Sequence, residues 1–177
     1  MVSDHRDLGR GNQLSLLIVF ADLTRYTAET ERNPDREVAR IMDAFYERVA
    51  ARVEPASGRI VKFIGDAALI VFPESAVDRA IPALLDLKDD IDAFFPETGW
   101  ECRINIKAHI GSVIAGPYGG ASDKRFDILG RAVNRTARLK GAGVVLSAEA
   151  FHKLGPELRA RFAVKEATGT YLALRQG

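Results

Sequence analysis

The chain has 177 residues, of which 47% are hydrophobic and 28% charged, and its formal net charge is +1. This composition is typical of one globular domain and excludes a disordered chain, and the near-neutral charge argues against a protein built mainly to grip nucleic acid. The only cysteine, Cys102, excludes an internal disulfide and a cysteine-based metal knuckle.

No stretch of the sequence favours a membrane. None approaches the roughly 18 consecutive apolar residues that span a bilayer. The first residues are polar, include Gly9 and Gly11, and lack the apolar core of a signal peptide. We therefore predict a flexible leader over residues 1–13, a single domain over residues 14–177, and a cytoplasmic protein without a membrane span.

The first half of the domain predicts a strand, a helix and a hairpin. Residues 14–20 are a continuous apolar run, which is typical of a strand buried on both faces. Residues 36–53 carry apolar side chains at spacings of three and four, which indicates an amphipathic helix. Within residues 58–72, two apolar runs flank Gly65, which suits the positive φ of a tight two-residue turn. We expect Asp66 at the tip of that hairpin.

The second half predicts another helix and strand, followed by a mixed tail. A helical pattern follows Pro73 and reaches residue 95, and Pro82 should kink this helix or move its start, because proline lacks an N–H donor. Residues 101–115 alternate as a strand with one face in the core, and Gly-rich residues 116–122 should form a loop. The tail predicts a strand at 125–129, a helix at 131–140, a strand at 144–146, a small helix capped by Ser147, and an antiparallel pair at 161–165 and 170–174.

The order of the early elements indicates the fold class. Strand, helix, hairpin, helix and strand form the ferredoxin-like βαββαβ arrangement of the α+β class, here with additional C-terminal strands and short helices. We expect strand 14–20 to lie beside hairpin strand 58–64 in the centre of the sheet. Asp22, directly after the first strand, would then converge with Asp66 at one end.

Two converging carboxylates have three chemical readings. They can share one proton, flank a glycosidic bond, or bind a hard cation such as Mg²⁺ together with substrate phosphates. Asn134 and Arg138 lie four apart on the predicted helix and share one face. Arginine suits developing phosphoryl charge and asparagine can orient a sugar oxygen, although each is singly more common as a plain surface residue. His109 and Trp100 are expected to pack in or beside the core.

Four segments, in order, resemble the catalytic domain of the class III nucleotidyl cyclases, the adenylate and guanylate cyclases. They are residues 20–22, residues 62–67, the arm from Gly111 to Gly130, and residues 127–138. The resemblance covers about residues 14 to 174. Its implied reaction is in-line attack of a ribose 3′-hydroxyl on the α-phosphorus of a nucleoside triphosphate, with pyrophosphate leaving.

The resemblance also assigns roles to single residues. It implies that Asp22 and Asp66 bind two Mg²⁺ or Mn²⁺ ions per site. It implies that Lys62 and Asp127 read adenine, since guanylate cyclases usually have Glu and Cys at these positions. It implies that Asn134 positions the ribose and Arg138 stabilises the transition state, with Lys165 as the nearest candidate for the family's phosphate-binding lysine.

A head-to-tail homodimer is part of what the resemblance implies. One protomer would supply the aspartates and the other the base-reading, Asn and Arg side chains, and backbone N–H groups of residues 23–27 would take phosphate oxygens. The sequence departs from the family at Arg25, where a small glycine is usual, and Arg131 and Arg135 add charge near the last motif.

Three other functions stay open at this point. The chain could cyclise another nucleotide, giving a cyclic pyrimidine or cyclic GMP instead of cyclic AMP. It could be a catalytically silent cyclase-like domain that binds a nucleotide or a partner, which Arg25 and the unclear lysine favour slightly. A ferredoxin-like nucleic-acid binder is disfavoured, because spaced exposed aromatic and basic residues are missing from the predicted sheet.

Overall fold

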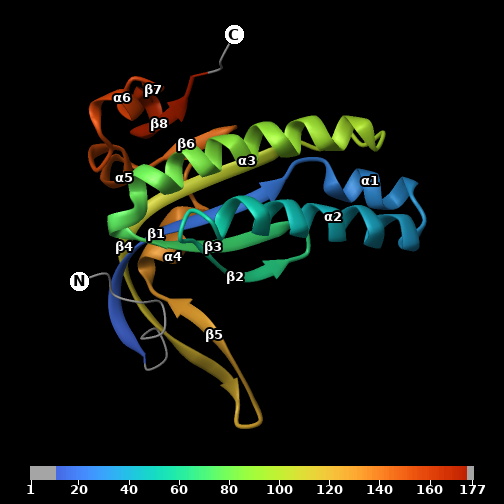
Figure 1. Cartoon of the computed structure of the whole chain (residues 1–177), viewed down its shortest axis with the longest axis horizontal. Coiled ribbons are helices and arrows are strands. Elements are labelled where there is room, and N and C mark those ends of the chain that lie inside the picture. The colour runs from blue at the N-terminus through green and yellow to red at the C-terminus, as the bar shows by residue number, and fades with distance from the viewer. Residues whose placement is uncertain (1–10, 175–177) are drawn as a thin grey trace.

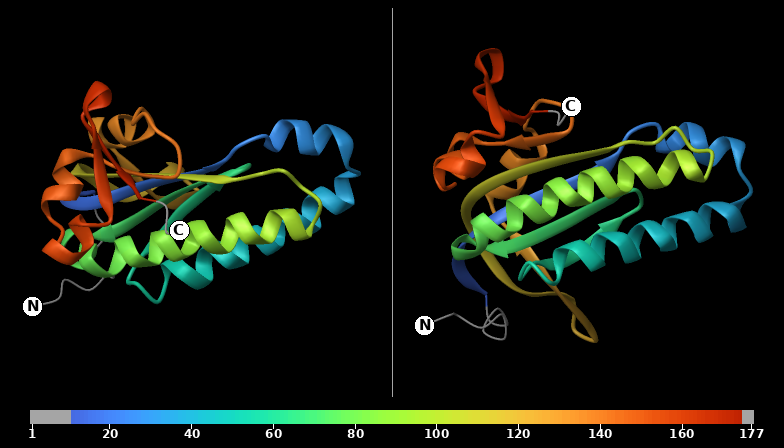
Figure 2. Two further views of the ribbon diagram at one scale, coloured as in Figure 1. Left: turned by 90° about the horizontal axis from the view of Figure 1, so that it is seen from above. Right: turned by 45° about the horizontal axis from the view of Figure 1, so that its top comes forward.

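The computed structural model describes residues 11–174 and consists of one sheet with helices on both faces. Within this range the sheet has the strand order β2-β3-β1-β4-β6-β8-β7, and β5 pairs with β4 outside that row. In Figures 1 and 2, α2 and α3 run side by side along one face of the sheet. The predicted α+β fold with a ferredoxin-like core and extra C-terminal elements is confirmed.

The strands are β1 (Asn12–Leu23), β2 (Arg59–Ile64), β3 (Ala67–Pro73), β4 (Ile104–Gly120), β5 (Asp123–Leu129), β6 (Val144–Leu146), β7 (Phe162–Lys165) and β8 (Thr170–Ala173). The α-helices are α1 (Tyr26–Arg32), α2 (Asp35–Val53), α3 (Val77–Glu97), α4 (Arg131–Ala137), α5 (Ala148–His152) and α6 (Pro156–Arg159), with short 3₁₀ turns at Glu74–Ala76 and Glu166–Thr168.

Alternate residues of β1 face two different cores. The larger core lies under α2 and α3 and takes Leu17, Val19 and Ala21 from β1. The smaller core lies under α4 and β5 and takes Leu16 and Ile18, with Phe20 packed against it. Because successive side chains of a strand point to opposite faces, Asp22 belongs to the α4 face of the sheet.

One expected strand neighbour is wrong. β1 pairs with β3 and β4, so hairpin strand 58–64 does not lie beside residues 14–20. β3 is buried from Ala68 to Phe72, as a strand with neighbours on both sides must be, whereas β2 is partly exposed and occupies the edge. The hairpin itself is confirmed, with Gly65 at φ 58° in a two-residue turn between Ile64 and Ala67.

Residues 116–120 are not the predicted loop. β4 continues through Gly120 and pairs with β5, from Ile114 opposite Leu129 to Gly120 opposite Asp123. These two strands project from the body as an arm, at the bottom of Figure 1. Glycines at 116, 119 and 120 indicated a loop, but hydrogen bonding between the two strands decided the conformation instead.

Several helix bounds differ from the prediction. α1 was not predicted from the pattern, because its residues lack an apolar period. α3 continues past Pro82 without interruption. The proline, which has no N–H donor, is the sixth residue of the helix and therefore lies near its start, which follows a 3₁₀ turn. α4 ends at Ala137, three residues before the predicted end, and Arg138 is its C-terminal cap residue. β6, the Ser147 cap of α5 and the antiparallel pair of β7 and β8 are confirmed.

The predicted leader mostly lies outside the described residues, and its last two residues, Asn12 and Gln13, are already part of β1. Trp100 and His109 are buried, as expected, with 2% and 3% of their surface exposed. Among the described residues, no helix has the length and apolar character that crossing a membrane requires.

Candidate functional site

Asp22 and Asp66 lie next to each other at one end of the sheet, as predicted. Asp22 is opposite Ala67 in the register of β1 and β3, and the amide of Leu23 donates to the carbonyl of Asp66 at 3.3 Å. Both residues are partly buried. Burial raises the pKa of Asp22, the positive charge of Lys107 lowers it, and the negative charge of Asp66 raises it.

This pair of carboxylates fits a divalent cation. Within the described residues, neither the Asp22 nor the Asp66 side chain accepts a hydrogen bond or forms an ion pair. Two partly buried carboxylates that repel each other and accept no hydrogen bond are stabilised when a cation binds between them. No third His, Cys, Asp or Glu joins them among these residues, which suits Mg²⁺ or Mn²⁺ with ligands completed by water and phosphate.

Lys62 and Asp127 meet each other although 65 residues separate them. Lys62 Nζ lies 2.5 Å from Asp127 Oδ2, and Asp127 Oδ1 accepts the backbone N–H of Ile128 at 2.8 Å. The Arg59 guanidinium stacks 3.6 Å from the ring centre of Phe126, which holds β5 against β2 beside this pair. The two residues predicted to read the base therefore stand side by side in one chain.

Asn134 and Arg138 are exposed on α4 and at its end. The amide of Arg138 donates to the Asn134 carbonyl at 3.2 Å, so both belong to one helical turn. α4 lies directly on β4 at Gly111, where an added Cβ would stand 2.5 Å from the Ala132 Cβ. Glycine at this position thus permits the close approach that places the two side chains.

Sequence reasoning missed Lys107. It lies opposite Phe20 in the register of β1 and β4, one diagonal step from Asp22, and its Nζ donates to the Ala137 carbonyl at 3.3 Å. Lys107 therefore lies beside the aspartates and also holds the end of α4. Its position in the alternating pattern of β4, on the face away from Ile106 and Ala108, was the available signal.

A network that is buried at His109 and Ser147 and exposed at Arg135 joins α4 to the body of the domain. His109 Nδ1 lies 2.9 Å from Ser147 Oγ and 3.5 Å from Glu149 Oε2, and Glu149 Oε1 pairs with Arg135 at 2.8 Å. Burial is the main cause that lowers the pKa of His109, so the ring is neutral at pH 7. The extra charge of Arg135 thus connects α4 to α5.

Arg25 is engaged by Glu101 in this structure. Its guanidinium pairs with Glu101 at 2.7 Å, and its backbone has φ 62°, the left-handed region that glycine adopts without strain. Two of the amides predicted to take phosphate oxygens are already used, since Leu23 donates to Asp66 and Thr24 donates to Arg103.

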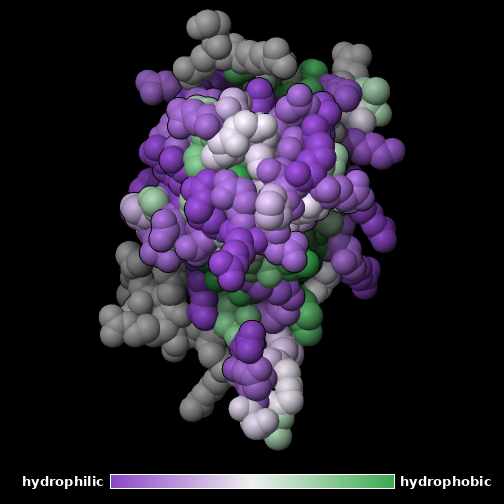
Figure 3. Space-filling view, turned by 90° about the vertical axis from the view of Figure 1, so that its right-hand side faces the viewer, coloured by the Kyte–Doolittle hydropathy of each residue, from purple (hydrophilic) through white to green (hydrophobic). Residues whose placement is uncertain are grey.

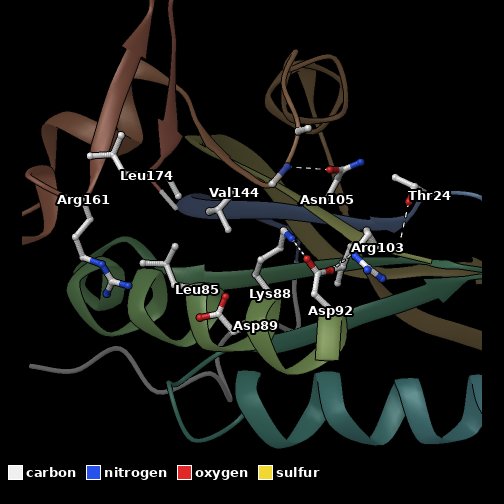
Figure 4. Close-up of a pocket in the computed structure, with 14 residues that line it drawn as sticks. Thr24, Leu85, Lys88, Asp89, Asp92, Arg103, Asn105, Val144, Arg161 and Leu174 are labelled. Atoms are coloured by element: carbon white, nitrogen blue, oxygen red, sulfur yellow. Dashed lines mark hydrogen bonds and ion pairs between the residues drawn. The ribbon is translucent and has the colours of Figure 1, made fainter. Parts of the chain in front are cut away.

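The structure does not bring Lys165 to the other predicted residues. It is exposed at the end of β7, the last strand in the sheet order. A cavity of about 880 Å³ lies between α3 and the start of β4 (Figure 4). Lys88, Asp92, Arg103 and Asn105 line it, and none of the seven predicted site residues does.

The family description "Adenylate and Guanylate cyclase catalytic domain" matches residues 12–166. The chain belongs to this family. It is 26% identical over 143 residues to an adenylate cyclase of Anabaena cylindrica, covering 76% of this chain and 28% of that protein. It is 28% identical over 179 residues to an uncharacterised protein of Mycobacterium tuberculosis, covering 93% of this chain and 31% of that protein. The cyclase domain thus spans less than a third of these relatives.

Solved cyclase structures share the fold. A bacterial light-regulated adenylyl cyclase superposes with a TM-score of 0.81 at 20% identity, over 93% of this chain and 52% of that chain. The guanylyl cyclase Cya2 superposes with a TM-score of 0.77 at 20% identity, over 88% and 83% of the two chains. Because enzymes for both bases share the fold, the base must be argued from the site.

Proposed function

We propose that this cyclase domain converts ATP into 3′,5′-cyclic AMP and pyrophosphate. Family membership supports the reaction class, and the pairing of Lys62 with Asp127 at 2.5 Å supports adenine. An ammonium donor and a carboxylate acceptor side by side complement a ring-nitrogen acceptor beside an exocyclic amine, which is the pattern that adenine presents. The chain would act in the cytoplasm, where its substrate is made.

Each remaining side chain has a task in this proposal. Asp22 and Asp66 would hold two Mg²⁺ or Mn²⁺ ions, which when bound supply positive charge to the phosphates and favour ionisation of the 3′-hydroxyl. Asn134 would orient the ribose, and the fixed cation of Arg138 would stabilise charge that develops on the transferred phosphoryl group. Lys165, exposed at the end of β7, is the candidate for the outer phosphates.

The proposal includes a head-to-tail homodimer with two shared sites. The candidate residues lie on an open face in one chain, and large apolar side chains nearby are exposed, including Ile64 at 52% and Leu129 at 49%. Figure 3 shows hydrophobic surface between the polar body and the projecting arm. A second copy would cover this surface and exclude water from the nucleotide. A guanylyl cyclase domain from Blastocladiella emersonii, with a TM-score of 0.77 to this chain, is described as a non-canonical dimer, so it supports self-association of this fold but not the head-to-tail arrangement.

Cyclic CMP is the second candidate product. Cytosine offers the same pattern as adenine, a ring-nitrogen acceptor beside an amine donor, so the pair formed by Lys62 and Asp127 does not by itself exclude CTP. Guanine instead places a carbonyl oxygen next to ring and exocyclic N–H donors. ATP is favoured over CTP because the resemblance at these two positions is to adenylate cyclases.

The test is to incubate the protein with Mn²⁺ or Mg²⁺ and each of ATP, GTP, CTP and UTP, and to identify the cyclic product by mass spectrometry. Cyclic AMP as the main product supports the proposal, and a cyclic pyrimidine or cyclic GMP overturns the assignment of the base. The Asp66→Ala variant, which should form no cyclic product, is the negative control. Absence of any product at concentrations where the dimer forms contradicts the proposal and favours a silent binding domain.

A further inference from the structure

Lys107 lies between Asp22 and the end of α4 within one chain. Its side chain is on the α4 face of the sheet, because Ile106 and Ala108 on either side face the helix-covered core. Phe20 is its cross-strand partner, and Asp22 is the next residue on the same face of β1. Diagonal neighbours in an antiparallel pair are about 7–8 Å apart at the backbone, within reach of a long side chain.

One contact holds the Lys107 ammonium in place. It donates to the carbonyl of Ala137 at 3.3 Å, one of the last carbonyls of α4 that lack a partner within the helix. Within the described residues no carboxylate lies close enough to form an ion pair with it. The positive charge of this ammonium lies near Asp22: burial raises the pKa of that carboxyl group, and Lys107 opposes this by lowering it.

A positive charge in this place acts oppositely on two ligands. It repels a bare divalent cation that approaches the pair of aspartates. It attracts a cation already bound to a triphosphate, because that complex carries net negative charge. For charges roughly 8 Å apart, and with a dielectric constant between those of protein surface and water, each effect is on the order of tenfold in affinity.

We propose that Lys107 couples metal loading to nucleotide binding: its ammonium weakens the binding of a bare divalent cation at Asp22 and Asp66 and strengthens the binding of the metal–triphosphate complex. This inference rests on the proposed function, since it takes the aspartates as the metal ligands. Lys107 is a positioning residue in this view, because it acts through charge and through its hold on α4.

The experiment measures two dissociation constants without turnover. Mn²⁺ alone is titrated while the paramagnetic signal of the free ion is followed, and the Mn²⁺ complex of α,β-methylene ATP is titrated by calorimetry. In Lys107→Met we expect Mn²⁺ to bind about tenfold more tightly and the nucleotide complex about tenfold more weakly than in the unchanged protein. Both differences should shrink as salt is raised from 20 to 500 mM, because the charges are screened.

Three further variants make the result specific. Lys107→Arg keeps the charge and should retain both affinities within about twofold. Lys124→Met removes an exposed lysine of β5 near the tip of the arm and should change neither. Asp66→Ala should bind Mn²⁺ much more weakly than the unchanged protein.

The outcomes distinguish a failure of the metal assignment to Asp22 and Asp66 from a failure of the role proposed for Lys107. If Asp66→Ala binds Mn²⁺ as tightly as the unchanged protein, the metal assignment itself is wrong. If Asp66→Ala loses Mn²⁺ but Lys107→Met shifts both affinities in the same direction, or shifts neither, the metal assignment stands and the role of Lys107 is refuted.

Discussion

The contact between Gly111 and α4 offers a direct test of how the fold positions the candidate residues Asn134 and Arg138. An alanine at position 111 would place its Cβ 2.5 Å from the Ala132 Cβ and 3.0 Å from His109 Nε2. Carbon atoms in contact normally stand about 3.5–4.0 Å apart, so α4 must move about 1 Å away from the sheet. Because α4 carries Asn134 and leads into Arg138, both side chains would move with it.

The expected losses differ between stability and rate. Overpacking of this kind costs about 1–3 kcal/mol of the free energy of unfolding, so Gly111→Ala should still fold. A displacement of about 1 Å in a catalytic group costs on the order of a hundredfold in rate. We therefore expect kcat for cyclic AMP formation to fall about a hundredfold, while the melting temperature falls by about 2–12 °C and the domain stays folded at assay temperature.

Two companion variants control the experiment. Gly120→Ala lies on the same strand, has open space around its α-carbon and should leave kcat unchanged. Ala132→Gly removes one of the two clashing atoms. The Gly111→Ala/Ala132→Gly double variant should therefore recover most of the lost kcat, and the remaining close contact with His109 should account for the part that is not recovered. Full activity in Gly111→Ala, or a double variant no better than the single one, would refute the reasoning that close packing at this point sets the geometry.

Three further predictions concern the site residues and pH. Asp66→Ala and Arg138→Ala should each abolish turnover without unfolding the domain, and mixing the two inactive proteins should restore up to about a quarter of the activity through one intact shared site; confirmed mixed dimers without any recovery would exclude the shared-site arrangement. The double change Lys62→Glu with Asp127→Cys should shift the ratio of kcat/KM from ATP towards GTP, and an unaltered ratio would show that the base is read elsewhere. His109 has a pKa lowered below its ordinary value of 6.5 by burial, so the unfolded chain binds the proton more readily; the free energy of unfolding should be constant above about pH 6.5 and fall as the pH drops below it, and His109→Gln should flatten that fall in urea titrations at pH 7.5 and 5.5.

The sequence was informative where one local pattern decides the structure. The apolar run before Asp22 and the glycine turn before Asp66 placed both carboxylates at one end of the sheet, and the register of β1 and β3 confirms this. Periodicity likewise located α2 and most of α3. In each case the strand or helix is buried on one face or on both, and this burial produces a regular pattern of apolar residues along the sequence.

Long-range pairing could not be inferred in the same way. Glycines at 116 and 119 suggested a loop, but pairing with β5 made this segment a strand. The choice of β3 over β2 as the neighbour of β1 likewise depends on total burial across the sheet. Lys107 was missed because its importance comes from Asp22 on one neighbouring strand and from α4 above, neither of which is close in sequence.

The two cores described above are unequal, and this has a consequence for how the domain opens. The core under α2 and α3 gathers most of the large buried side chains, whereas the one under α4 and β5 is small and closes over a helix of seven residues. Local opening free energies follow buried apolar contact, so amide hydrogens of α4 should exchange well before those of α2. The half of the domain that carries Asn134 could thus loosen and tighten while the other half stays folded.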